Sequence, residues 1–103
     1  MYTLFGSEGS GSAAIEIALE RCAVPFTLIR ASSWEEGAGQ EALRPVNPLL
    51  QVPTLVLADG TVLTESAAIL IHLGLEHPNA GLLPKQTSAR AQAFRGLVYI
   101  ATN

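Results

Sequence analysis

The sequence predicts an α/β domain with the element order β-α-β-α-β-β-α, a mixed four-stranded sheet, and one further helix after it. Residues 2–30 read as strand, helix and strand, in a length that suits a right-handed βαβ unit with parallel strands. Asp59-Gly60 stands between two apolar runs, and this pattern predicts a tight antiparallel hairpin over residues 54–63. A parallel unit joined to a hairpin gives a mixed sheet.

The first half of the chain supplies two strands and two helices. A β-prone run at residues 2–5 predicts the first strand, and a loop of glycines and serines follows at residues 6–12. A helix is expected over residues 13–21, because apolar residues recur there at helical spacing, and the second strand is expected at residues 26–30. A loop with one short, irregular helix near residues 40–44 should come next.

The second half continues from the hairpin into a helix. Thr64 offers an N-cap for a helix over residues 65–77, which Pro78 ends. The central part of this helix, residues 67–75, is apolar on almost every side. Because the sheet can cover only one of its faces, we expect the other side to meet another domain or another subunit.

Composition limits the partners of the protein. The chain has 103 residues, six lysines and arginines in total, and a net charge of −3, so it lacks the basic surface of a nucleic-acid binder or an anionic-membrane binder. We expect no signal peptide and no transmembrane segment. The single cysteine, Cys22, excludes an internal disulfide and a Cys-x-x-Cys redox pair, and it fits a reducing, cytoplasmic location. Its helical spacing from Ile15, Ala18 and Leu19 favours an inert core thiol.

Residues 47–66 contain the features expected of a ligand site. Pro53 stands at the entrance of a strand and leaves a backbone group of Val52 outside the ladder, where a peptide ligand can pair with it. Glu65 and Ser66 fall in the first turn of a helix, where free N–H groups and the positive end of the helix dipole favour a small anion. The stretch therefore combines a peptide-pairing edge with an anion-binding helix start.

Four short motifs in this stretch resemble the glutathione site of the cytosolic glutathione S-transferases: Asn47-Pro48, Gln51-Val52-Pro53, Asp59-Gly60 and Glu65-Ser66. The likeness covers residues 1 to about 85 and implies the thioredoxin-like N-terminal domain of that family, with glutathione as co-substrate. It implies that Val52 pairs its backbone with the cysteine unit of the tripeptide and that Pro53 is cis. Glu65 and Ser66 would hold the γ-glutamyl end, and Gln51 would contact the peptide backbone or the glycine carboxylate.

The same resemblance divides the chain into two parts. Residues 1–80 would form the glutathione-binding domain, and residues 81–103 would form a linker and the first helix of a truncated all-α C-terminal domain. That helix should start at Thr87 and bury a stripe of residues: Ala91, Phe94, Val98 and Ala101. The pocket for a small electrophilic substrate would lie mostly in the missing half. Because the helix over residues 67–75 and this stripe would leave apolar surface uncovered, we expect a homodimer. We also expect little transferase activity from the 103 residues alone.

A hydroxyl near the start of the first helix would suffice to hold the glutathione sulfur as a thiolate. Lowering a thiol pKa of about 8.5 by about two units requires roughly 2.7 kcal/mol, and one hydrogen bond to a charged group contributes roughly 1.5–3 kcal/mol. Ser7, Ser10 and Ser12 lie in the loop before that helix. We take Ser10 as the first candidate for this catalytic role and Ser12 as the second, and helix capping remains the alternative for each.

The loop nevertheless departs from the simple patterns of the family. Counted back from Pro25-Phe26, the slot of the serine-type members falls on Gly9 and that of the cysteine-type members on Gly11. The tyrosine-type slot falls on Phe5, which has no hydroxyl. A shift of one residue in the loop would bring Ser10 into place.

Other functions remain as rivals. Gly9-x-Gly11-x-x-Ala14 matches the dinucleotide fingerprint, but Arg30 stands where an acidic ribose ligand is expected and a hairpin replaces the third parallel strand. Thiol–disulfide reduction is disfavoured by the missing cysteine pair. A non-catalytic transferase-like module for protein association is the main alternative. His72 and His77 lack metal-ligand spacing, so no metal is expected.

Overall fold

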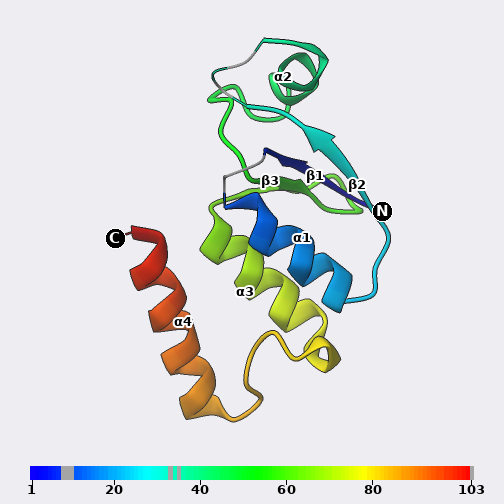
Figure 1. Ribbon diagram of the computed structural model, residues 1–103. Helices are drawn as coiled ribbons and strands as arrows, with labels where there is room; N and C mark the ends of the chain where they lie inside the picture. Colours follow the sequence, from blue (N-terminus) through cyan, green and yellow to red (C-terminus); the bar gives the residue numbers. More distant parts are fainter. Residues whose placement is uncertain (8–10, 33, 35, 103) are drawn as a thin grey trace.

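The computed structural model describes residues 1–7, 11–32, 34 and 36–102, and within them the element order is the predicted one. The strands are β1 (Tyr2–Gly6), β2 (Phe26–Arg30), β3 (Thr54–Val56) and β4 (Val62–Thr64). The helices are α1 (Ser12–Arg21), α2 (Ala38–Leu43), α3 (Ser66–Glu76), the short 3-10 helix η1 (Pro78–Ala80) and α4 (Thr87–Thr102). Figure 1 shows α1 and α3 on one face of the sheet, α2 on the other, and α4 beside α3.

The sheet is mixed and has the strand order β2-β1-β3-β4. β1 runs parallel to β2, with Tyr2 opposite Phe26 and Gly6 opposite Arg30, as the predicted βαβ unit requires. β3 is antiparallel to both β1 and β4. The third strand of the chain is therefore not parallel to the first, which excludes the doubly wound sheet that a dinucleotide fingerprint requires.

The larger hydrophobic core lies between the sheet and the two helices α1 and α3, which contact each other. Its buried side chains come from the strands and from both helices: Leu4, Ile15, Ala18, Leu19, Leu55, Ile69 and Leu73. Burial of this size is the main favourable term in folding. The packing of these side chains also fixes the starts of α1 and α3 relative to β3. The candidate site lies where these three segments meet.

Replacing Leu73 by alanine is expected to lower the free energy of unfolding by about 2–5 kcal/mol, because a large buried side chain leaves a cavity behind. Leu73 has no exposed surface, whereas Leu75, two residues further along α3, is 53% exposed. Leu75→Ala is the matched control and should cost less than about 0.5 kcal/mol. Equilibrium denaturation measures both, and equal losses would contradict the packing described for α3.

A smaller core on the other face holds α2 against the sheet. Phe5, Ala31 and Leu43 are its buried members. α2 begins two residues earlier than predicted, and it approaches β2 so closely that a Cβ atom on Gly39 would lie 1.7 Å from the carbonyl oxygen of Arg30. A glycine is therefore required at this contact.

The start of α3 differs from the sequence prediction. Thr64 ends β4 and pairs with Thr54 across the hairpin, so the prediction that it caps the helix is wrong. Glu65 occupies the N-cap position instead, without a capping hydrogen bond from its side chain, and α3 begins at Ser66. Glu65 adopts φ 68° and ψ 115°, a backbone conformation that costs a residue with a Cβ roughly 1–3 kcal/mol.

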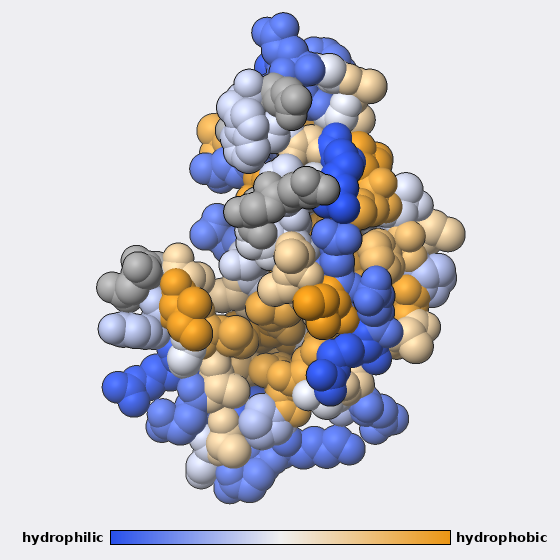
Figure 2. All heavy atoms as spheres, viewed as in Figure 1, coloured by the Kyte–Doolittle hydropathy of each residue, from blue (hydrophilic) through white to orange (hydrophobic). Residues whose placement is uncertain are grey.

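α4 packs against α3 and provides part of the second cover that α3 was expected to need. The predicted stripe on α4 is wrong at three of its four positions, since Ala91, Val98 and Ala101 are exposed, and it is right at Phe94, which is partly buried. The partly buried residues of α4 lie mostly one or two positions before the exposed ones: Arg90, Ala93, Phe94, Gly96 and Leu97. Figure 2 shows apolar side chains gathered across the α3 and α4 region of the visible face. The exposed apolar residues of these two helices include Leu75, Val98, Tyr99 and Ile100.

Candidate functional site

Five of the residues that the sequence singled out lie together around one cleft. The cleft has a volume of about 340 Å³, and seven of the described residues line it: Gly11, Gln51, Val52, Pro53, Thr64, Glu65 and Ser66. They come from the start of α1, the loop before β3 and the junction of β4 with α3. Figure 1 shows these three segments at the same end of α1 and α3. Sequence reasoning marked Gly11 only as the slot of the cysteine-type members and Thr64 only as a helix cap, and it named neither as a ligand-binding residue.

The loop before β3 presents Val52 outside the strand ladder. The pairing of β3 begins at Thr54, so the backbone of Val52 is not part of the sheet. The Val52–Pro53 peptide bond is cis, which agrees with the expectation from the family resemblance. The side chain of Val52 packs against the smaller core on the α2 face. The loop thus holds a backbone segment at the edge of the cleft.

Buried polar contacts fix the shape of this loop. The Asn47 side chain donates from Nδ2 to the Gln51 carbonyl oxygen at 3.4 Å and to Thr54 Oγ1 at 3.2 Å. The Thr54 hydroxyl also donates to the Gln51 oxygen at 2.8 Å, and Asn47 Oδ1 accepts from the Leu49 N–H at 3.1 Å. Both Asn47 and Thr54 are buried, and buried hydrogen bonds of this kind hold a backbone in one conformation. The sequence marked Asn47 only as part of a motif.

The start of α3 offers one negative group and several hydrogen-bond donors. The first N–H groups of a helix have no partner within the helix, and the positive end of its dipole favours an anion there. Ser66 is partly buried and adds a hydroxyl, whereas the carboxylate of Glu65 is exposed beside it. This pair of groups suits the two charges of an amino-acid end: the carboxylate of the ligand toward Ser66 and its ammonium toward Glu65.

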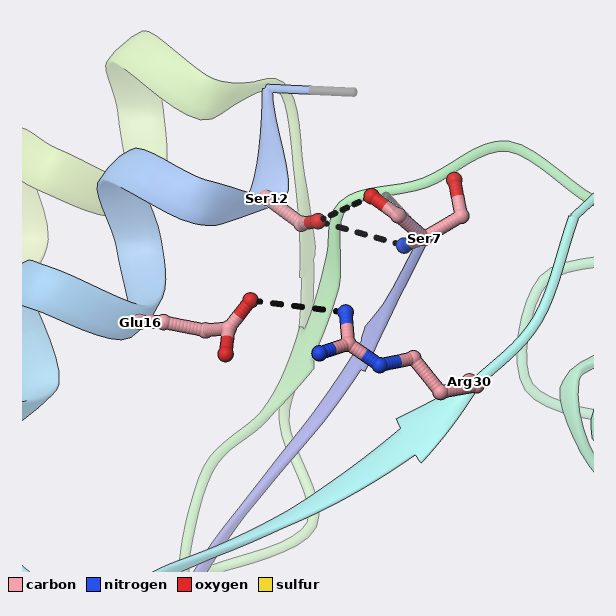
Figure 3. A network of polar contacts seen from close by, with 4 residues as sticks. All are labelled: Ser7, Ser12, Glu16 and Arg30. Carbon is pink, nitrogen blue, oxygen red and sulfur yellow. Dashed lines mark hydrogen bonds and ion pairs between the residues drawn. The ribbon is translucent and has the colours of Figure 1, made fainter. Parts of the chain in front are cut away.

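Two hydrogen bonds of the Ser12 side chain join the start of α1 to Ser7, which follows β1. The Ser12 hydroxyl donates to the Ser7 carbonyl oxygen at 3.0 Å and accepts from the Ser7 N–H at 3.2 Å, as Figure 3 shows. Ser12 is fully buried as the first residue of α1, and Gly11 rather than a serine occupies the N-cap. This geometry favours a structural role for Ser12. Ser10 lies outside the described residues, so its catalytic role stays a prediction.

A second cavity of about 470 Å³ lies beyond the carboxyl ends of β1 and β2. Its lining comes from the ends of these strands and from the segment that leads into α2: Ser7, Arg30, Ala31, Ser32, Trp34, Glu36, Gly37, Gly39 and Gln40. Arg30 supplies a guanidinium there, 3.6 Å from the Glu16 carboxylate of α1 (Figure 3). Sequence reasoning missed this cavity, although the general rule that ligands bind at the carboxyl ends of parallel strands points to it.

Cys22 lies at the other end of α1, away from the cleft. It follows the last turn of the helix and packs against the larger core. Burial raises the pKa of the Cys22 thiol, so that less of it is thiolate at neutral pH. This agrees with the prediction of an inert core thiol.

In the described ranges no group of three or more His, Cys, Asp or Glu side chains could hold a metal ion. Over the same part of the chain, none of the helices combines the length and the apolar character needed to cross a bilayer.

The sequence and the fold were compared with known proteins. Residues 12–76 match the family model described as glutathione S-transferase, N-terminal domain. The chain is 36% identical to the uncharacterized GST-like protein YncG of Escherichia coli K12, over all of this chain and 50% of that protein. It is 37% identical to glutathione S-transferase GstA of Escherichia coli O157:H7, over 96% of this chain and 50% of that protein. The chain thus spans about half the length of these relatives.

Solved structures give the same result. A glutathione transferase homologue from Sulfitobacter, crystallised with bound glutathione, superposes with a TM-score of 0.86 at 35% identity and covers all of this chain and 50% of its own. A sphingomonad glutathione S-transferase complexed with glutathione gives a TM-score of 0.82 at 33% identity, with 96% of this chain and 50% of that one covered. At these identities the likeness extends beyond the fold to the family.

Proposed function

Because the chain belongs to the glutathione S-transferase family and has the thioredoxin-like fold of its N-terminal domain, we propose that it binds glutathione and holds its sulfur for attack on an electrophile. The observation that supports this most is the convergence of Gln51, Val52, Pro53, Glu65 and Ser66 on one cleft. Gln51, Val52 and Pro53 come from the loop before β3, whereas Glu65 and Ser66 come from the start of α3, and the hairpin between them brings both groups to the same space.

The γ-glutamyl end of glutathione is placed at the start of α3 in this proposal. That end has the carboxylate and the ammonium of an amino acid. The Ser66 hydroxyl and the first N–H groups of α3 would donate to the carboxylate, and the exposed Glu65 carboxylate would accept from the ammonium. The strained backbone of Glu65 agrees with a functional position, because such strain concentrates at ligand sites.

The cysteine unit would pair with the backbone of Val52, which lies outside the ladder of β3. Extended peptides are bound in this way at free strand edges. Gln51 is exposed next to it and would contact the peptide backbone or the glycine carboxylate. This direction places the sulfur near the start of α1, where Ser10 remains the candidate to donate a hydrogen bond to the thiolate. The thiolate would then form a carbon–sulfur bond with the electrophile.

Calorimetric titration with glutathione tests the proposal. Heat that saturates at millimolar ligand or below, together with a higher melting temperature, is the expected result, because a ligand that binds only the folded state stabilises it. Absence of both signals at millimolar glutathione would overturn the proposal. The electrophile itself has to be sought with the full-length protein if the chain is part of one, since the relatives are about twice as long.

Ser66→Ala is expected to weaken glutathione binding by roughly three- to twentyfold, because one of several hydrogen bonds to the ligand's carboxylate is lost while the N–H donors of α3 remain. Glu65, not Ser66, occupies the N-cap position of α3, so unfolding should change little. Calorimetry and chemical denaturation give the two readings. Ser88→Ala, at an exposed position near the start of α4, is the control and should leave binding unchanged. A loss of stability with unchanged affinity would assign Ser66 a purely structural role.

We further propose that residues 1–80 form the glutathione-binding domain and that residues 81–103 form the linker and first helix of an all-α domain. We also propose a reducing, cytoplasmic location.

A homodimer is proposed on the exposed apolar residues of α3 and α4. An exposed apolar patch beyond a few hundred Å² is uncommon on a monomer, so the chain should self-associate at micromolar concentration in sedimentation experiments. The same surface favours the second candidate function, a module for protein association. A monomer with full transferase activity would contradict both statements.

A further inference from the structure

The carbonyl oxygen of Gln51 is held from the buried side of the loop before β3. It accepts from the Thr54 hydroxyl at 2.8 Å and from Asn47 Nδ2 at 3.4 Å. Thr54 has no exposed surface, and Asn47 is only 7% exposed. Two buried side chains therefore fix the direction in which this one oxygen points.

The direction of the Gln51 oxygen also sets that of the Val52 N–H, because both atoms belong to one peptide unit. The Gln51–Val52 bond is trans, since the cis bond of this loop is the next one, between Val52 and Pro53. In a planar trans peptide the C=O and the N–H point to opposite sides. The Val52 N–H is thus directed away from the buried side chains of Asn47 and Thr54.

Both donors are anchored outside the loop that they hold. Thr54 is the first residue of β3, and it pairs with Phe5 of β1 and with Thr64 of β4. The backbone N–H of Asn47 donates to the Leu43 carbonyl oxygen, at the end of α2, at 2.8 Å. The sheet and α2 therefore fix the two donors, and the donors fix the peptide that they bind.

We propose that Asn47 and Thr54 are positioning residues for glutathione, which hold the Gln51–Val52 peptide so that the Val52 N–H meets the cysteine unit of the ligand. Neither of the two side chains lines the cleft, so each acts through the loop. A loop that is ordered before binding costs less entropy when the ligand arrives. This inference rests on the proposed function, because it assumes that glutathione pairs with the backbone of Val52.

Two substitutions of Thr54 separate positioning from a purely structural role. Valine keeps the volume of threonine without its hydroxyl, whereas serine keeps the hydroxyl and leaves a small cavity that lowers stability. Thr54→Val is expected to weaken glutathione binding by roughly three- to tenfold, the effect of one hydrogen bond, and Thr54→Ser by less than about twofold. Calorimetry measures the affinities, and chemical denaturation measures the stability of each variant.

Ile69→Val is the control for lost stability. Ile69 is fully buried in the larger core and does not line the cleft. This variant should be less stable than the unaltered protein and bind glutathione equally well. If the affinities of the Thr54 and Ile69 variants follow their stabilities, and not the presence of a hydroxyl at position 54, the proposal is overturned.

Asn47→Asp tests the second donor. The new carboxylate still accepts from the Leu49 N–H but cannot donate to the Gln51 oxygen. Glutathione binding should weaken at least as much as in Thr54→Val, by roughly three- to tenfold or more. Unchanged affinity of the folded variant would remove Asn47 from the proposal.

Hydrogen exchange at the Val52 amide tests the proposal in the unaltered protein, so it also decides the matter if Thr54→Val does not fold. Bound glutathione should slow this exchange by roughly tenfold or more, because the N–H then lies in a hydrogen bond to the ligand. The same exchange rate with and without bound glutathione would overturn the proposal, since the positioned group would not meet the ligand.

The outcomes separate this inference from the proposed function. If glutathione gives no binding heat with the unaltered protein, the proposed function fails and the inference fails with it. If glutathione binds, but Thr54→Val binds it as tightly as Thr54→Ser does, only the inference fails. Binding that is weakened in Thr54→Val and retained in Thr54→Ser, together with slowed exchange at Val52, supports both.

Discussion

Replacing Glu65 by glutamine is expected to weaken glutathione binding by roughly ten- to a hundredfold, because a charged hydrogen bond to the ligand's ammonium contributes about 1.5–3 kcal/mol. The free energy of unfolding should change little. The side chain of Glu65 makes no capping hydrogen bond, it is exposed, and glutamine has the same backbone demands at φ 68°. Calorimetry measures the affinity, and denaturation measures the stability.

A control on the same helix shows whether the effect depends on the position of Glu65 in the cleft or only on the loss of a surface charge. Glu76 is an exposed glutamate at the other end of α3, and Glu76→Gln should leave glutathione affinity unchanged. Glu65→Gly adds a sharper comparison: it relieves the positive φ, so the fold should not be weakened through strain, while the ligand's ammonium loses its partner. Glu65 variants that bind glutathione as tightly as the unaltered protein would remove this residue from the site.

Replacing Gly39 by valine is expected to lower the free energy of unfolding by about 3 kcal/mol or more, beyond the usual range for overpacking. The new Cβ would lie 1.7 Å from the backbone oxygen of Arg30, so α2 has to move away from β2. Gly96→Ala is the control on α4, where the described residues leave the position of a Cβ open, and it should stabilise the helix by up to about 1 kcal/mol. Denaturation midpoints of the two variants measure the contrast.

Gly39 variants also test whether glutathione binds in the cleft or in the second cavity. Gly39 lines the cavity at the ends of β1 and β2, and it does not line the cleft. A Gly39 variant that remains folded at low temperature should therefore keep its affinity for glutathione. If Gly39→Val unfolds no more easily than Gly96→Ala, the close contact of α2 with β2 does not exist in solution.

Local patterns predicted most of the fold. The Asp59-Gly60 turn fixes the hairpin because a tight turn needs φ > 0, and Gly60 adopts φ 91° there. The apolar spacing along α1 predicted the buried side chains of Ile15 and Leu19. The motif around Val52 and Pro53 predicted which loop borders the cleft. In each case the determining interactions lie within a few residues of each other.

The predictions that failed depend on tertiary contacts. Thr64 has the chemistry of an N-cap, but its pairing with Thr54 keeps it in the sheet and shifts Glu65 to the cap position. Ser12 was expected in the loop before the first helix, yet it is the first residue of α1 and is buried, with hydrogen bonds to Ser7. The stripe on α4 was misplaced because the angle at which α4 meets α3 cannot be read from one helix. The larger cavity joins segments whose proximity only the fold establishes.

A proton–nitrogen correlation spectrum of the labelled protein, recorded with increasing glutathione, tests the central claim most directly, since it reports binding and its location together. The claim predicts saturable shifts of the amide signals around the cleft, at Gly11, Gln51, Val52, Glu65 and Ser66. The signals of Cys22 and of α4 beyond Gly96 should remain in place. An unchanged spectrum at millimolar glutathione, or shifts confined to residues away from this cleft, would contradict the assignment of a glutathione site to this chain.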